Sequence, residues 1–339
     1  MVDQHPAWVL GAVEPNRTER ICLIANPKAA GGRVGKRLDE LRTLADEAFE
    51  SWELRLTEGP NHASELASGA VHDGFDIVAA VGGDGTCHEV VNGLVSPEVP
   101  ADHGSIFTVV PFGTGSDLVR SLQIPTNTEE ALAIANCGIT VATDVGHARY
   151  VGSDGSLTER RFINVCGFGA NGEVANRVNA GSKKLGGSVP FVKATLRTLG
   201  DYRAQRVRLT WTGPDGEGEW IGELLSAFVA NGFYCGGGMF VGKGASMHDG
   251  QFAFTVIEDA NIVRLLVNLP RLFTGTIHQA SPAFRVTASR LRAEAVDDGK
   301  PILVELDGEQ PGALPLDLEI LPRVLQVRGG WLENPVGSQ

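Results

Sequence analysis

The fold is decided by the stretch AAVGGDGTCHEVVNGL, residues 79–94. It overlaps a short apolar run, residues 75–81, whose length and partly β-branched composition predict a buried strand. After Thr86, the apolar residues Val90, Val91 and Leu94 are spaced as in a helix. The glycines around Asp84 therefore lie at a turn from strand to helix. Such a turn lets backbone approach a ligand closely, and the helix N-terminus behind it favours anions.

The segments on either side repeat this alternation of strand and helix. Strand-like runs at 21–25, 52–56 and 105–110 alternate with helical spacing at 34–48 and 62–71. Alternation of this kind predicts a parallel sheet covered by helices.

The pattern changes near Thr140, after which strand-like segments separated by turns dominate. The strand candidates there are 161–166, 207–212, 220–231, 252–257, 282–287, 301–306 and 316–320, and the helix candidates are 173–178, 189–199 and 262–273. This composition of elements predicts a β-rich sandwich or barrel-like domain. A length of 339 residues is also about right for two domains.

Composition limits the classes of function. A net charge of −12 argues against a general nucleic-acid binder, which needs basic surface to offset phosphate charge. Five scattered cysteines without a C-x-x-C pair predict reduced thiols in a cytosol. The N-terminus lacks the basic region of a signal peptide, and the apolar segment 261–273 contains Arg264, Pro270 and Arg271, so no bilayer span is expected. We expect a cytoplasmic protein, at most peripheral to a membrane.

Three predicted strands end in unusual loops. The loops are 26–32 (NPKAAGG), 82–86 (GGDGT) and 111–117 (PFGTGSD). In an open parallel sheet, ligands bind beyond the carboxyl ends of the strands, so these loops should lie at one edge. Glycine-rich backbone with hydroxyls and carboxylates suits a polyphosphate with Mg²⁺, although each loop alone also fits a plain tight turn.

Other signatures are absent or incomplete. A Walker A loop fails because Arg37 follows Gly35-Lys36. The sequence GFGANG at 167–172 matches a dinucleotide fingerprint, but no acidic residue follows at 190–195, so we interpret it as a turn. No zinc-like histidine pair and no G-x-S-x-G elbow occur.

The GGDGT core with Glu89 and Asn92-Gly93 closely resembles the signature of the diacylglycerol kinase catalytic domain. Further similar motifs follow in order from about residue 20 to 328: Asn26-Pro27, Pro111 to Asp117, Asn231-Gly232, Gly236-Gly237-Gly238, Asp249-Gly250 and Asp307-Gly308-Glu309. The core alone is shared with NAD kinases and phosphofructokinases. The ordered set is much more specific, because it spans nearly the whole chain.

The resemblance implies a fold and domain boundaries. It implies a Rossmann-like three-layer α/β nucleotide domain at 20–143, of the phosphofructokinase and NAD-kinase type, and a C-terminal β-sandwich domain at 144–321. A last strand within 322–333, at Val324 to Arg328, would return to the first domain. Residues 1–19 and 334–339 are expected as tails.

The resemblance also implies an ATP- and Mg²⁺-dependent lipid kinase, and roles for individual residues. Glu309 is expected to be the general base for the acceptor hydroxyl, with Asp307 orienting it or sharing the role, although on spacing alone this segment also fits an ordinary turn. Asp84 is expected to act near the β- and γ-phosphates through Mg²⁺. The other nucleotide contacts are expected from Asn26, Pro27, Lys28, Ala29, Ala30, Thr57, Gly82, Gly83, Gly85, Thr86, Cys87, His88, Glu89, Gly113, Thr114, Gly115 and Asp117. A second, structural Mg²⁺ is expected at Asp249 with carbonyls of Ser246 and Gln251, and with Asp144 through water.

One segment departs from the acidic character of the chain. Residues 177–208 hold eight basic residues and one acidic residue, with apolar residues interleaved. Such a segment could dock on an anionic membrane, where a lipid substrate is found, or could be a solvated helix face packed on the second domain.

The acceptor stays open at this stage. We expect diacylglycerol, giving phosphatidic acid, with a sphingoid base or another hydroxylated lipid as alternatives. An NAD kinase-like phosphotransferase and a catalytically silent nucleotide- or lipid-binding protein are the rival functions.

Overall fold

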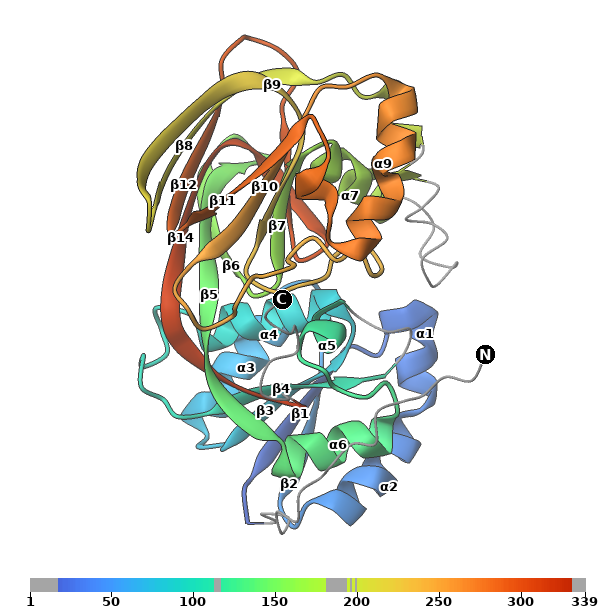
Figure 1. The fold of residues 1–339 in the computed structure, drawn as a ribbon. Coiled ribbons are helices and arrows are strands. Elements are labelled where there is room, and N and C mark those ends of the chain that lie inside the picture. The colour runs from blue at the N-terminus through green and yellow to red at the C-terminus, as the bar shows by residue number, and fades with distance from the viewer. Residues whose placement is uncertain (1–17, 113–116, 181–193, 196, 199, 331–339) are drawn as a thin grey trace.

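The computed structural model describes residues 18–112, 117–180, 194–195, 197–198 and 200–330. Figure 1 shows two domains, one with helices around a sheet and one built mainly of strands. The helices are α1 (Ala29–Lys36), α2 (Leu38–Ala48), α3 (His62–His72), α4 (Asp84–Leu94), α5 (Asp117–Ser121), α6 (Thr128–Cys137), α7 (Ala170–Ala180), α9 (Ile262–Thr274) and the 3-10 turn η1 (Ile277–Gln279). The strands are β1 (Ile21–Ala25), β2 (Trp52–Leu56), β3 (Ile77–Gly82), β4 (Ile106–Pro111), β5 (Ile139–Gly152), β6 (Leu157–Phe162), β7 (Val165–Gly169), β8 (Gln205–Gly213), β9 (Gly216–Ala230), β10 (Phe252–Glu258), β11 (Ala283–Ala288), β12 (Arg290–Ala295), β13 (Leu303–Leu306) and β14 (Glu309–Gly329).

The first domain is a parallel sheet in the order β4-β3-β1-β2. Strands β1 and β3 are buried along their whole length, as expected where helices cover both faces of a parallel sheet. Because the strands are parallel, their carboxyl ends meet at one edge, where the glycine-containing turn after β3 lies. The α/β part of the predicted fold is confirmed.

The second domain is a set of antiparallel strands, β5 to β14, around its own apolar core. Phe162 and Phe252 stack in this core with ring centroids 5.6 Å apart, and Tyr150 is fully buried beside them. Helices α7 and α9 lie on one side of these strands (Figure 1). The β-rich second domain is confirmed as well.

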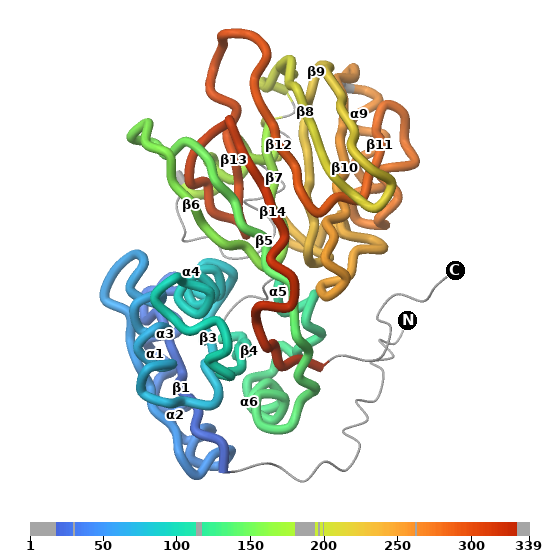
Figure 2. Tube along the Cα trace, turned by 90° about the vertical axis from the view of Figure 1, so that its left-hand side faces the viewer, coloured from blue at the N-terminus to red at the C-terminus, as the bar shows by residue number. Residues whose placement is uncertain are grey.

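Strand β14 joins the two domains. It pairs antiparallel with β5 along both domains, and near its end Gln326 pairs in parallel with Ile106 of β4. Figure 2 shows β14 and β5 running side by side from one domain to the other. Since β14 begins at Glu309, this long strand also fixes the position of the turn that precedes it.

Three local differences from the sequence prediction have physical causes. The single helix expected over 34–48 is wrong, because the chain breaks at Arg37, whose side chain bonds Glu40 and lies over the Phe112 ring. Helix α4 begins at Asp84, before the helical spacing that the sequence shows after Thr86. Gly82 (φ 155°) turns the chain directly out of β3, and Gly83 O accepts from the amides of Thr86 and Cys87. The strand expected at 161–166 is interrupted between β6 and β7. Most of the expected helix 189–199 lies outside the described residues.

Candidate active site

A cleft of about 330 Å³ lies between the two domains. The first domain contributes the start of α4 and helix α5, and the second contributes α7, the link between β6 and β7, and the turn between β13 and β14. Its ionisable lining residues are Asp84, Cys87, His88, Asp117, Arg120, Cys235, Glu305 and Asp307. Acidic groups from distant parts of the sequence therefore meet at one place.

The floor of the cleft on the first domain is the turn between β3 and α4. Among the described residues, no side chain caps the N-terminus of α4, whose positive dipole end favours an anion. A Cβ at Gly83 would meet no atom of the described residues within 4 Å, so among them the space above the turn is open. This geometry suits the phosphates of a nucleotide.

Asp84 and Asp117 are held next to one another at this floor. The Asp84 carboxylate accepts long hydrogen bonds of 3.3 Å from the amides of Asp117 and Leu118. Asp117 in turn accepts from the Gly237 amide at 2.6 Å and from Arg120 at 2.8 Å. Burial raises the pKa of Asp117, the expected direction for a carboxyl group withdrawn from water. Both acids thus face the space above the α4 N-terminus.

Asp307 is the structural hub of the cleft. Its buried carboxylate accepts hydrogen bonds from the backbone amides of Ile163, Asn164 and Val165 at 3.0, 2.9 and 3.1 Å. His88 of the first domain lies 3.2 Å from the same carboxylate. These contacts occupy Asp307 and explain why the chain breaks between β6 and β7: the amides there turn toward the carboxylate instead of extending the ladder.

Glu309 approaches the start of α4 from the second domain. A Cβ built on Gly85 would stand 3.2 Å from Glu309 Oε1, so the carboxylate of the second domain reaches the first turn of α4. Within the described part of the chain, no hydrogen bond or ion pair engages this carboxylate. A partly exposed, unengaged carboxylate at the edge of the cleft is well placed to accept a proton from a substrate.

Glu305 is a site residue that sequence reasoning missed. It accepts from the Gly308 amide at 2.5 Å and from Asn171 Nδ2 at 3.1 Å, and it is buried. Burial raises the pKa of Glu305 to about 8, and smaller contributions in the same direction come from the charges of Asp307, Asp117 and Asp84. No motif marks it, and the available signal was only its place two residues before Asp307 in an otherwise apolar strand.

This shift predicts a pH-dependent contribution to stability. The folded protein holds the Glu305 proton up to about pH 8, whereas an exposed chain releases it near 4.5, so its stabilising contribution is full at low pH and lost as the pH rises between these values. Above about pH 8, we expect Glu305→Gln to have a free energy of unfolding larger than that of wild type, by an amount on the order of a few kcal/mol. This difference should disappear as the pH falls toward about 5. The measurement is urea unfolding of the nucleotide-free protein across this range. Parallel pH profiles for the two proteins would contradict the assignment.

The structure places the other predicted nucleotide residues in several ways. Asn26, Pro27, Lys28 and Ala29 follow β1, and Thr57 follows β2, all at the carboxyl edge of the sheet. Gly82 to Cys87 form the turn and the first part of α4. Glu89 instead faces α3, where Oε2 accepts from the Ala63 amide at 3.1 Å. Gly113, Thr114 and Gly115 lie outside the described residues, as do the side-chain surroundings of Ala30, so these contacts stay predictions.

The predicted second metal site brings two carboxylates together at the domain junction. Asp144 is buried and accepts from the amides of Gly250 at 2.6 Å and Arg323 at 2.8 Å. Burial, with a smaller contribution from Asp144, raises the pKa of Asp249. Gln251 Oε1 is buried without a hydrogen-bond partner. No group of three His, Cys, Asp or Glu side chains forms a metal site in the described ranges, so a second Mg²⁺ held with the carbonyls of Ser246 and Gln251 stays a prediction.

Two family models match the chain. The diacylglycerol kinase catalytic domain matches residues 20–148, and the YegS C-terminal NAD kinase beta sandwich-like domain matches residues 164–329. These two matches correspond to the two domains of the structure.

Individual proteins agree with the family models. A Stenotrophomonas maltophilia protein named "Probable lipid kinase YegS-like" is 30% identical over 312 residues, which cover 90% of this chain and 94% of that protein. The diacylglycerol kinase of Bacillus subtilis is 27% identical over 309 residues, covering 91% and 96%. A crystal structure of a diacylglycerol kinase from Bacillus anthracis has the same fold, with a TM-score of 0.65 at 21% identity, covering 94% and 97%. The chain therefore belongs to the diacylglycerol kinase catalytic domain family, and it is a kinase.

Proposed function

We propose that the protein transfers the γ-phosphoryl group of ATP to the hydroxyl of a lipid, with diacylglycerol as acceptor and phosphatidic acid as product. The observation that carries the lipid assignment is a mainly apolar cavity next to the carboxylate cleft. Asn171 lines both spaces, so one acceptor could present its hydroxyl to the cleft and its chain to the cavity. The names of the relatives, lipid kinase and diacylglycerol kinase, support the same class of acceptor.

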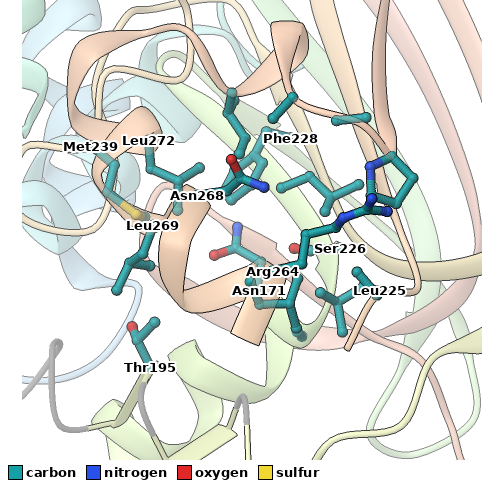
Figure 3. A pocket seen from close by; sticks show the side chains of 18 of the residues that line it. Asn171, Thr195, Leu225, Ser226, Phe228, Met239, Arg264, Asn268, Leu269 and Leu272 are labelled. Carbon is teal, nitrogen blue, oxygen red and sulfur yellow. The ribbon is translucent and has the colours of Figure 1, made fainter. Parts of the chain in front are cut away.

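The apolar cavity lies between α9 and the sheet of the second domain (Figure 3). Its apolar lining includes Leu225, Phe228, Met239, Leu265, Leu269 and Leu272. Its volume of about 80 Å³ is below the roughly 300–1,000 Å³ typical of a ligand pocket. An acyl chain would therefore require α9 to move outward from the sheet.

ATP would lie over the turn between β3 and α4. The N-terminal turn of α4 would hold its phosphates through the helix dipole, and Mg²⁺ bound with ATP would neutralise phosphate charge. Asp84 and Asp117 face this space and would act on the phosphates through Mg²⁺ or its waters. Asp249, Ser246, Gln251 and Asp144 would hold a second Mg²⁺ that stabilises the domain junction.

Transfer needs a base on the acceptor side. The acceptor hydroxyl would give its proton to Glu309 while its oxygen forms a bond to the γ-phosphorus, and the bond from that phosphorus to the bridging oxygen would break to release ADP. Asp307 is a positioning residue in this scheme. Its contacts to three amides and to His88 hold the turn that carries Glu309 against the first domain.

Gly83 offers a direct test of the nucleotide position. Its φ of −117° and ψ of −169° are allowed for alanine, and an added Cβ meets no atom within 4 Å. Gly83→Ala should fold normally, but its methyl group would occupy space that the phosphates need. We expect the KM for ATP to rise at least about ten-fold, a loss typical of a displaced hydrogen-bonded ligand, with a much smaller effect on kcat.

The measurement is phosphatidic acid formation from diacylglycerol in mixed micelles as a function of ATP concentration. Gly59→Ala is the matched control, because that position is also open and has no positive φ. Absence of product with wild type would refute the proposed function. An unchanged KM for ATP in Gly83→Ala would show that the nucleotide does not bind at this turn.

A further inference from the structure

Helix α9 has an apolar face on its outer side. Val263 is 67% exposed and Val267 is 71% exposed, and Leu266 and Phe273 are each nearly half exposed. Their positions, with the exposed Pro270 between them, follow the three- and four-residue spacing of one helix face. The inner side of the helix is apolar too, because Leu265, Leu269 and Leu272 line the cavity beneath it. A contiguous exposed apolar face of this kind marks an interaction surface.

The charges on this helix are basic. Arg271 is exposed, and Arg264 is exposed while its side chain also lines the cavity beneath the helix (Figure 3). No acidic residue occurs within Ile262–Thr274. No carboxylate within the described ranges forms an ion pair with either arginine. Side-chain carbons of Lys243 lie next to Gly275 at the end of the helix, 2.7 and 2.9 Å from where a Cβ on Gly275 would stand. The nearest acid along the chain is Asp259, before the first turn of the helix. In a chain of net charge −12, this is a local reversal of sign.

We propose that the outer face of α9 docks on the surface of an anionic lipid bilayer. The combination of exposed apolar residues with flanking arginines is complementary to acyl chains beneath anionic headgroups. A helix of 13 residues is about 20 Å long and would lie flat in the interface. This inference rests on the proposed lipid acceptor, because docking on α9 would bring the cavity beneath it to the membrane that contains the acceptor.

The basic segment 177–208 is a weaker candidate for the same role. Lys183, Lys184 and Lys193 lie outside the described residues. Among its described arginines, Arg177, Arg197 and Arg208 pair with carboxylates, whereas the exposed Arg203 and Arg206 form no ion pair within the described ranges. Arginines engaged by carboxylates have less charge to offer a membrane than those on α9.

The test is co-sedimentation with vesicles made of equal parts phosphatidylcholine and phosphatidylglycerol. Val263→Glu with Val267→Glu places two negative charges on the docking face at positions that contribute little to the core. We expect binding at least about ten-fold weaker than wild type. Arg271→Gln is expected to weaken binding about five-fold to these vesicles and to leave binding to pure phosphatidylcholine unchanged.

Leu157→Glu is the matched control. Leu157 is 73% exposed, and it begins β6, on the far side of the second domain from α9 in Figure 2. Vesicle binding retained in this control and lost in the double variant would support docking through α9. Equal binding by the double variant and wild type, or no binding by wild type, would overturn it.

Two further readouts separate the possible failures. The double variant should keep wild-type activity on diacylglycerol in micelles, where no bilayer is needed, so absence of activity in wild type would refute the proposed function rather than the docking surface. Light scattering would show whether the face is covered by a second copy. A wild-type dimer that becomes a monomer in the double variant would overturn the membrane proposal.

Discussion

Glu309→Gln is expected to slow phosphoryl transfer by roughly 10²–10⁴-fold, the usual contribution of a general base. The substitution removes a proton acceptor and keeps the size of the side chain. Because the Glu309 carboxylate has no hydrogen-bond partner in the described ranges, the fold should lose nothing. Its position beside Gly85 places it at the edge of the proposed nucleotide site, so the affinity for ATP should change by no more than a few-fold.

The measurement is kcat with a saturating lipid acceptor, together with the dissociation constant of ATP by calorimetry. A large loss in kcat at unchanged ATP affinity and unchanged thermal unfolding is the predicted pattern. Glu309→Asp is the control, since a shorter carboxylate should retain part of the rate. Turnover by Glu309→Gln close to wild type would mean that another group takes the proton.

Asp307→Ala is expected to destabilise the protein by about 3 kcal/mol or more. Three buried backbone amides lose their acceptor, and each unsatisfied group costs about 1–3 kcal/mol. Asp307 also has a φ of 48°, a left-handed conformation that alanine adopts less readily than aspartate or asparagine. Since His88 of the first domain contacts the same carboxylate, the substitution should also weaken the contact between the two domains.

Asp307→Asn separates the loss of the hydrogen-bond acceptor from the cost of the left-handed backbone conformation. Asparagine tolerates the left-handed conformation and keeps one oxygen acceptor, so it should recover a substantial part of the stability lost in the alanine variant. Urea unfolding followed by circular dichroism and tryptophan fluorescence measures both variants. Equal midpoints for wild type and Asp307→Ala would show that Asp307 is not the hub of the cleft.

The two-domain fold class and the glycine-rich turn after β3 could be predicted because their signals are local. Buried parallel strands appear as short apolar runs, and the glycines that end β3 stand in one stretch of sequence. The carboxyl edge of a parallel sheet then predicts where the loops meet.

The partners of Asp307 could not be predicted, because they lie far away in the sequence. Ile163 is 144 residues from Asp307, and His88 is 219 residues away, so no spacing rule connects them. The same contacts interrupt an apolar run that otherwise indicates one strand. Glu305 was missed because its raised pKa arises from burial in the assembled cleft.

The outer face of α9 could not be predicted from the sequence either. The sequence shows that the segment 261–273 is apolar and contains arginines, but not which side packs against the sheet. Only the structure distinguishes the inner residues at the cavity from Val263 and Val267 on the surface. Among the described residues, no helix has the length and apolar character needed to cross a bilayer.

The most direct test of the proposed function is transfer of labelled γ-phosphate from ATP with Mg²⁺ to competing acceptors. Diacylglycerol, sphingosine and ceramide would be offered together in mixed micelles, with NAD in solution, and the labelled products identified by chromatography. We predict label in phosphatidic acid. Label in another lipid would show that the acceptor is not diacylglycerol, while the assignment as a lipid kinase would stand. Label in NAD alone, or in no acceptor while ATP still binds, would contradict the account.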